Sequence, residues 1–138
     1  ITNRTVYNFN VGTPTLALFD GSTNQSTIAG TALNTYYHIA WCRAAGISRL
    51  FRDGTPGADF TDSQNFTTTT CSVARFPGST VSTLLGFVDE FRVTRRARYT
   101  DAFTAPIAAF DSFRAALQDP HYATVVALLN LEGPNGRT

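Results

Sequence analysis

A hairpin pattern in the middle of the chain restricts its fold more than any other feature. Residues 36–43 (YYHIAWCR) are apolar on both alternating faces, as expected for a strand that is covered on two sides. Residues 44–46 (AAG) provide a turn, and residues 47–52 (ISRLFR) have the composition of a returning strand. This second strand stops at the Asp-Gly pair of residues 53–54, a common tight-turn sequence. The pattern therefore predicts a central β-hairpin.

Turn-forming residues separate this hairpin from other short stretches of strand-like composition. The predicted strands cover residues 5–10, 15–19, 67–74, 86–94 and 122–131. Residues 21–34 and 55–65 are predicted to be loops, the first with a short strand near Ile28. Predicted helix is confined to one turn over residues 95–99 and a short helix over residues 111–118. Many short strands between turns predict an all-β fold, an antiparallel β-sandwich or jelly roll.

Composition agrees with a single globular domain. The chain has 138 residues, of which 43% are hydrophobic, and this is enough for one core. All 11 of its cationic residues are arginine, and 10 acidic residues balance them to a net charge of +1. A dedicated nucleic-acid binder should be strongly basic, and a membrane-spanning helix needs about 20 consecutive apolar residues. We therefore expect neither nucleic-acid binding nor membrane insertion.

The two cysteines leave their redox state open. Cys42 and Cys71 lie on separate predicted strands. They form either a disulfide or two buried thiols, because a disulfide depends on a Cα separation below about 7 Å that spacing along the chain does not fix. The chain has no C-x-x-C pair, which argues against a zinc site.

Two stretches of the sequence resemble one known family. The first, residues 36–54, contains YYHIA and a hairpin that ends in DG. The second, residues 86–106, contains GFVDEFRVT, then ARYT and FTAP. In their order and spacing they are similar to the laminin-G-like, concanavalin A-type domains of bacteriophage virion and tail proteins, with Tyr36 where that family usually has Trp. The resemblance covers roughly residues 30–110 and implies a concanavalin A-like jelly roll.

A third stretch, residues 119–136, resembles the opening strand of such a domain, although here it comes last. The comparison predicts that residues 1–110 are the C-terminal part of a jelly roll that is incomplete at its N-terminal side. Residues 111–120 are then a connector that includes the short helix, and residues 121–138 begin a second copy. Half a sandwich leaves a bare apolar face and open sheet edges. We therefore expect residues 122–131 to pair with the chain's own sheet, a neighbouring subunit or a further segment.

Three aspartates are candidate ligands or structural residues. Asp59 and Asp62 lie in a predicted loop and are the residues that we single out for calcium, which takes six to eight oxygen ligands. Asp89 is predicted to share a strand face with Phe87 and Phe91, where a carboxylate needs a partner. We expect Asp89 to form a structural latch to a loop amide or an arginine, with a calcium or glycan ligand as the alternative.

Four arginines, Arg92, Arg95, Arg96 and Arg98, are clustered in sequence around Tyr99. We expect a structural role for Arg92 and Tyr99, in which the arginines pair with nearby acids and cap carbonyl groups at a corner. The alternative is that the cluster contacts phosphate or acidic sugars, since arginine pairs bidentately with such groups.

The sequence offers no catalytic residues. A glycosidase needs two acids about 5–9 Å apart on one surface, whereas Asp89 and Glu90 are predicted to point to opposite faces. His38 and Trp41 lie in the predicted central strand and are expected to be core residues. No nucleophile elbow or phosphate loop is present. We therefore expect a protein that is not an enzyme and that carries no cofactor other than the calcium considered above.

The resemblance implies a non-enzymatic structural or adhesion module of a phage particle, on its tail, fibre or capsid surface, assembled in the host cytoplasm. The expected partners are other virion subunits, including further copies in a homo-oligomer, and host-surface glycans. One alternative is an accessory carbohydrate-binding domain of a secreted or cell-surface bacterial protein. A less favoured alternative is a glycoside hydrolase.

Overall fold

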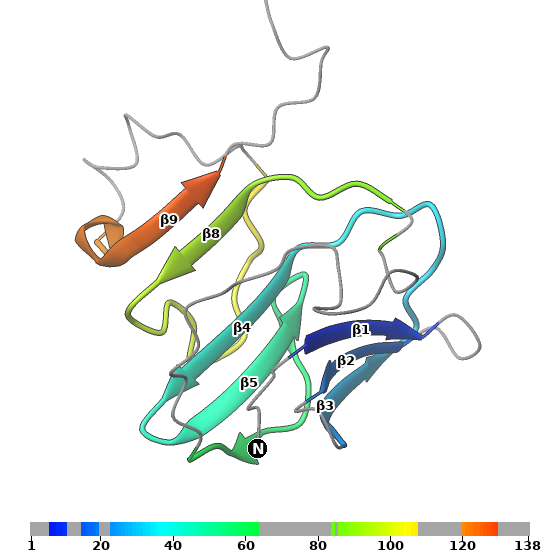
Figure 1. Ribbon diagram of the computed structural model, residues 1–138, viewed down its shortest axis with the longest axis horizontal. Coiled ribbons are helices and arrows are strands. Elements are labelled where there is room, and N and C mark those ends of the chain that lie inside the picture. Colours follow the sequence, from blue (N-terminus) through cyan, green and yellow to red (C-terminus); the bar gives the residue numbers. More distant parts are fainter. Residues whose placement is uncertain are drawn as a thin grey trace, which may run out of the picture.

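Antiparallel sheets contain all the strands in the described part of the chain (Figure 1). The computed structural model describes residues 6–10, 15–19, 23–63, 84, 86–107 and 120–129. Within these residues helix is limited to one 3-10 turn, η1 (Tyr122–Thr124), and every strand pairing is antiparallel. The prediction of an all-β protein is therefore confirmed. No helix in the described residues is long and apolar enough to cross a membrane.

The first sheet holds three strands in the order β1-β2-β3. They are β1 (Val6–Asn10), β2 (Thr15–Phe19) and β3 (Asn24–Ala29). β1 and β2 occupy predicted strands, whereas β3 is longer than the short strand expected near Ile28. Its sequence is mostly polar, but Ser26 is buried and its neighbours on either side are not, so β3 has one inner face and one outer face.

The central hairpin is confirmed and forms the second sheet. β4 (Ile39–Ala44) pairs with β5 (Ile47–Arg52) over their whole lengths. The two residues between them, Ala45 and Gly46, both have positive φ, 49° and 76°. This is the geometry of the two-residue turn that best matches the twist of a hairpin. β4 starts later than predicted, at Ile39, and residues 36–38 lie before the strand.

Two very short strands extend the second sheet on the far side of β5. β6 (Thr55–Pro56) and β7 (Phe60–Thr61) both pair with β5, within a segment that was predicted to be a loop. A second two-residue turn, Asp53 and Gly54 with φ of 51° and 82°, connects β5 to β6. β5 therefore has hydrogen-bonded neighbours on both edges.

The hydrophobic core lies where the first two sheets meet. Leu16 and Leu18 of β2 and Leu50 of β5 are 1% exposed or less. Four half-buried apolar side chains pack against them: Ile28, Ile39, Trp41 and Phe60. Trp41 thus takes the core position predicted for it.

The opposite face of β5 is covered by an aromatic cluster, which we call the aromatic corner and define as His38, Phe51, Tyr99 and Phe103. Tyr99 stacks on Phe103 with ring centroids 3.5 Å apart. The Phe51 ring makes T-shaped contacts with the rings of Tyr99 and Phe103, with ring centroids 6.2 and 5.3 Å apart. Because Phe51 and Leu50 are both fully buried, β5 is enclosed on both of its faces.

A two-stranded ribbon forms the third sheet. β8 (Phe91–Thr94) pairs with β9 (Val125–Leu129), and Figure 1 shows this ribbon beyond β4, on the side away from the first sheet. Of the three partners considered for residues 122–131, the structure shows the chain's own sheet for residues 125–129, whereas residues 122–124 form η1 instead of the predicted strand. The ribbon shares only sparse contacts with the other strands.

Two predictions near β8 are wrong. The predicted strand over residues 86–94 begins only at Phe91, because Glu90 has a φ of 54° and the Asp89 carboxylate accepts a hydrogen bond from the Glu90 amide. The predicted helical turn over residues 95–99 is a series of bends. There the Arg95 amide donates to the Thr124 carbonyl on the β9 side, so this amide is held by a distant segment instead of by a helix.

Several predictions lie outside the described residues. They include the strand over residues 67–74, the helix over 111–118, and Cys71. Cys42 is a half-buried free thiol on β4. The predicted division into residues 1–110, 111–120 and 121–138 stays a prediction.

Candidate binding groove

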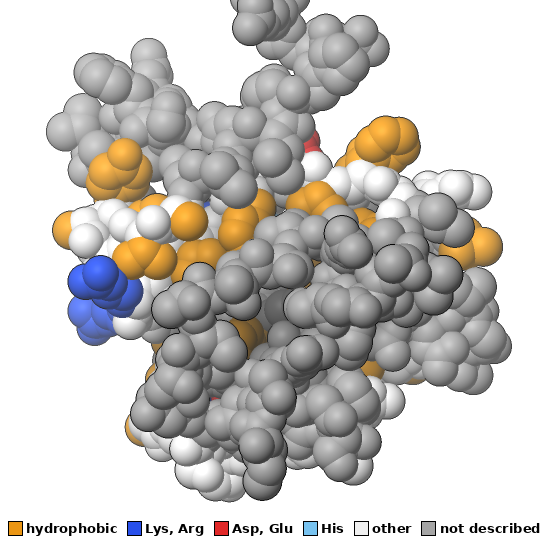
Figure 2. All heavy atoms as spheres, in the orientation of Figure 1, with side chains coloured by type: hydrophobic (Ala, Val, Ile, Leu, Met, Phe, Trp, Pro, Cys, Tyr) orange, Lys and Arg blue, Asp and Glu red, His pale blue; other side chains and the backbone are white. Residues whose placement is uncertain are grey.

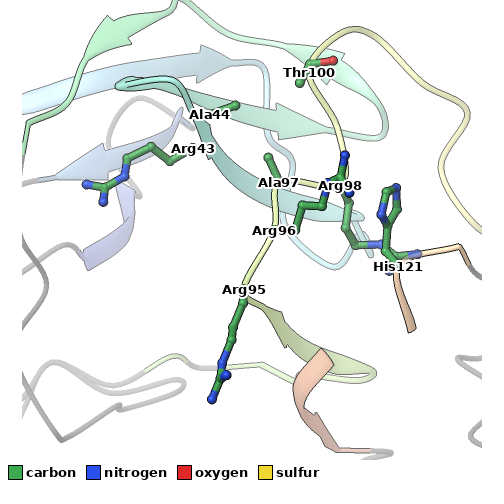
Figure 3. Close-up of a pocket in the computed structure, with 8 residues that line it drawn as sticks. All are labelled: Arg43, Ala44, Arg95, Arg96, Ala97, Arg98, Thr100 and His121. Carbon is green, nitrogen blue, oxygen red and sulfur yellow. The ribbon is translucent and has the colours of Figure 1, made fainter. Parts of the chain in front are cut away.

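A groove next to the end of β4 is lined mainly by arginine. Its lining includes four arginines, one histidine and one threonine: Arg43, Arg95, Arg96, Arg98, His121 and Thr100. Ala44 and Ala97 complete the lining among the described residues, and the cavity volume is about 510 Å³. We call this hollow the arginine groove (Figure 3).

Three segments that are distant in sequence bring these side chains together. Arg43 lies near the end of β4, Arg95 to Arg98 follow β8 directly, and His121 immediately precedes η1. The Arg95 amide donates to the Thr124 carbonyl at 2.8 Å, and Thr124 donates twice to the His121 carbonyl. These bonds hold the segment before β9 against the segment after β8, so the groove is built by the same pairing that joins the ribbon.

The arginine side chains differ in direction. Figure 3 shows Arg96, Arg98 and His121 grouped on one side of the groove, whereas Arg43 and Arg95 extend away from this group. Arg95 and Arg96 are exposed to solvent. The Arg96 carbonyl accepts a hydrogen bond from the Thr94 hydroxyl at 2.8 Å, which fixes the backbone from which its side chain leaves.

Asp62 carries a negative charge next to Arg43 but is almost completely buried. The Arg43 guanidinium lies 3.5 Å from the Asp62 carboxylate, whose side chain is 3% exposed. Ser48, also buried, donates to the other Asp62 oxygen at 2.7 Å and accepts from the Trp41 indole at 3.2 Å. Asp62 therefore anchors the segment after β7 to the hairpin through a buried polar network.

Asp59, the other candidate for calcium, pairs with Arg49 at 2.8 Å on the outside of the second sheet. Each of the two carboxylates is thus in contact with its own arginine. The described residues hold no group of three His, Cys, Asp or Glu side chains that could bind a metal ion. Calcium binding by Asp59 and Asp62 stays a prediction.

The three predicted structural residues occupy different places. Asp89 precedes β8, Arg92 lies on β8, and Tyr99 belongs to the aromatic corner. Asp89 is exposed, ahead of β8, and its carboxylate accepts from the amide of Glu90 at 2.9 Å. Arg92 is half-buried on β8, close enough for its charge to act on His38. In that corner Tyr99 stacks on Phe103 and makes a T-shaped contact with Phe51 of the hairpin.

His38 is half-buried in the aromatic corner. Its ring meets Phe103 and Tyr99 edge-on at 5.6 and 6.3 Å, and its Nδ1 atom has no hydrogen-bond partner in the described structure. Burial lowers the pKa of His38 below 6.5, and the positive charge of Arg92 lowers this pKa further, while Asp53 opposes both. His38 is therefore a packing residue that favours the neutral state.

Sequence reasoning identified only part of the arginine groove. The run of arginines before Tyr99 was recognised as a basic cluster, and Arg95, Arg96 and Arg98 do line the groove. Arg43 and His121 were missed as members, because no pattern along the chain connects the end of β4 to the residues before η1.

The fold and the groove define an all-β protein with a hollow lined mainly by arginine. Comparison with protein-family models, with curated proteins and with solved structures gave no match.

Proposed function

We propose that this chain is a non-enzymatic structural or adhesion module of a phage particle, displayed on a tail, fibre or capsid surface. On this proposal its fold is the concanavalin A-like jelly roll of the laminin-G-like domains that the sequence resembles. It holds on to partner subunits and to host-surface glycans, and it performs no chemistry.

The meeting of the two family-like stretches in space is the observation that carries the proposal. The stretches, residues 36–54 and 86–106, are separated by more than thirty residues in the chain. Yet His38 and Phe51 from the first pack against Tyr99 and Phe103 from the second. Residues that were grouped only by resemblance therefore form one packed unit, as expected if they are the structural signature of a single domain.

The packing of this unit explains why the Asp-Gly turn ends in glycine. Gly54 has a φ of 82°, and a Cβ atom placed on it would lie 1.7 Å from the Phe103 carbonyl oxygen. The Phe103 amide in turn donates to the Gly54 carbonyl at 3.1 Å. The exit segment of the second stretch thus passes so close to the turn of the first that only glycine fits there.

The chemistry of the described side chains favours holding over cleaving. The arginine groove supplies cations, methyl groups, a hydroxyl and an imidazole. Asp59 and Asp62 are each in contact with an arginine, and Asp62 is also buried. These contacts tie both carboxylates to arginines of the hairpin, which suits a structural role better than proton transfer to a substrate.

Exposed apolar side chains support contact with partner subunits. Leu33, Tyr36, Phe87 and Ile107 are each more than 70% exposed. Figure 2 shows apolar side chains at the surface of the region that contains β8 and β9, next to protruding basic side chains. Single exposed apolar residues are common, but several large ones on the described surface fit contact with neighbouring subunits.

Binding and turnover measurements test the absence of chemistry. The chain is screened on a glycan array, and the bound glycans are then incubated with it and examined for new reducing ends. We expect binding without new reducing ends. Hydrolysis that disappears on changing a carboxylate such as Asp59→Asn or Asp89→Asn would overturn the non-enzymatic proposal.

The location of the chain tests the proposal that it is part of a phage particle. A reconstruction of the phage that encodes the chain is expected to show it repeated by the symmetry of the tail, fibre or capsid. Recovery of the chain only from a bacterial secreted or cell-surface fraction would instead favour the accessory carbohydrate-binding domain.

A further inference from the structure

We propose that the arginine groove binds an acidic polysaccharide, a glycan whose sugars carry carboxylate groups. This inference rests on the proposed function, because it supplies the adhesion module with the chemical class of its ligand. It assigns the site to side chains from β4, from the segment after β8 and from the segment before η1.

The distribution of charge is the first argument. The whole chain has a net charge of only +1. Four arginines nevertheless line one hollow whose described lining includes neither Asp nor Glu, although one of the four, Arg43, is paired with the buried carboxylate of Asp62 at 3.5 Å. Positive charges gathered in a recess raise the local concentration of anions and steer them towards it. The near-neutral chain therefore presents a local basic site, not a basic surface.

The form of the side chains is the second argument. A guanidinium is a planar fork that donates two parallel hydrogen bonds to one carboxylate, and these charge-assisted bonds are stronger than neutral ones. Arg95 and Arg96 are exposed, and Figure 3 shows that they leave the same short segment in different directions. Two forks that point apart are suited to two successive acidic groups along a chain better than to a single small ion.

The size of the groove is the third argument. Its volume of about 510 Å³ lies within the range of sites that hold drug-sized ligands. A single phosphate or sulfate ion would leave most of this space empty. A segment of polysaccharide fills it, and the rest of the polymer can continue out of the groove.

The lining favours a glycan over a nucleic acid. Proteins that hold single-stranded nucleic acids stack bases on aromatic rings. The described lining of the groove contains no aromatic ring other than the imidazole of His121, and the ring of Tyr99 is stacked on Phe103 at 3.5 Å.

Charge-removing variants with a matched control test the site. Arg95→Gln, Arg96→Gln and the double variant each remove positive charge from the groove, and both side chains are exposed, so the fold should tolerate the change. The control is Arg49→Gln, which also removes one arginine, but from the ion pair with Asp59 outside the groove. Equal far-UV circular dichroism and thermal midpoints establish that the compared variants are folded.

The probes are polygalacturonate, neutral dextran and a single-stranded oligothymidylate, with binding measured by calorimetry at two salt concentrations. We expect the unmodified chain to bind polygalacturonate and not dextran. The double variant should bind about tenfold more weakly or worse, whereas Arg49→Gln should stay within about twofold. Arg96→Lys, which keeps the charge but loses the fork, should lie between the parent and Arg96→Gln.

Three outcomes overturn the inference. Equal affinity for dextran and polygalacturonate shows that the charge of the glycan is irrelevant. An equal loss in Arg49→Gln and in the groove variants shows that only total charge matters. Tighter binding of oligothymidylate than of polygalacturonate makes the ligand a nucleic acid.

These results separate the inference from the proposed function. If the chain is found in the particle but the groove variants bind like the parent, only the ligand assignment is wrong. If the groove binds polygalacturonate but the chain is never part of a particle, the proposed phage role is wrong and the site stands.

Discussion

The strand β5 and the ribbon of β8 and β9 are built from similar apolar residues but have opposite surroundings. β5 has paired strands on both edges and covered side chains on both faces, with Leu50 and Phe51 fully buried. In the ribbon each strand has one described partner, and Val126 is 49% exposed. The difference is one of context and not of strand propensity.

This contrast indicates where stability and recognition lie. Free energy gained from burial scales with the apolar area removed from water, so the hairpin and its two coverings dominate the stability of the described fold. The ribbon and the arginine groove next to it lie at the margin of that folded body. If the groove is the binding site that we propose, substitutions there change binding at little cost to the fold, which is the usual division between a scaffold and its recognition site.

The largest expected effect is the removal of the ring that joins the hairpin to the aromatic corner. Phe51→Ala deletes a fully buried side chain and leaves a cavity between β5 and the rings of Tyr99 and Phe103. We expect the free energy of unfolding to fall by about 3–5 kcal/mol, measured by urea titration. Phe51→Leu, which keeps much of the volume, is the control and should lose clearly less.

The next effect separates backbone strain from packing at two matched glycines. Gly54 and Gly46 have similar φ values, 82° and 76°, but a Cβ on Gly54 meets the Phe103 carbonyl and a Cβ on Gly46 meets nothing within 4 Å. Gly46→Ala should therefore cost about 1 kcal/mol for the left-handed backbone alone. Gly54→Ala should cost about 3 kcal/mol, because the exit segment must also move.

Equal losses of stability in the two glycine variants would contradict the close passage of Phe103 over the turn. Heteronuclear NMR spectra add a positional check. In Gly54→Ala the amide shifts should change around Phe103, whereas in Gly46→Ala they should change only near the β4–β5 turn.

A smaller effect is expected in the ribbon. Val126→Ala removes two methyl groups from a side chain that is half exposed, so the free energy of unfolding should fall by about 0.5 kcal/mol. The same urea titration measures it next to Phe51→Ala. A loss of unfolding free energy as large as that of Phe51→Ala would contradict the view that the hairpin contributes more to stability than the ribbon.

The smallest effect concerns pH. The pKa of His38 is lowered in the folded state, so just below pH 6.5 the unfolded chain binds more protons than the folded one. Stability from the neutral ring is thus fully present above pH 6.5 and is lost as the pH falls through the lowered pKa of the folded state. His38→Gln should show a shallower fall in urea midpoint between pH 7.5 and pH 5.5 than the parent. Parallel curves for the two proteins would contradict the burial of a neutral His38.

Local sequence was enough to predict the hairpin but not the approach to the ribbon. The turns at Ala45-Gly46 and Asp53-Gly54 each contain a glycine, and Asp53 also tolerates positive φ, so pattern and structure agree there. Before β8 the alternation of apolar residues continues back to residue 86, yet the Asp89 side chain bonds to the Glu90 amide and the strand starts only at Phe91. A side chain that binds nearby backbone competes with the ladder, and alternation alone does not reveal it.

The groove was only partly predictable for a related reason. Arg95, Arg96 and Arg98 are close together in the sequence and were found as a cluster. The segment that carries them was predicted to be helical, but the stack of Tyr99 on Phe103 and the bond from the Arg95 amide to Thr124 hold it in another shape. These contacts join distant segments, and Arg43 and His121 enter the groove through the same tertiary arrangement.

The pairing of β9 with β8 also covers one edge of β8 against pairing with other copies of the chain. A chain cut after Ile107 would lack β9 and would leave the amide and carbonyl groups of Phe91–Thr94 exposed along the edge that β9 now occupies. Among the described strands β8 would then be open along both edges instead of one, so the shortened chain should associate with identical chains more readily than the longer one. β9 thus covers an edge of β8 that would otherwise be free to pair with another chain.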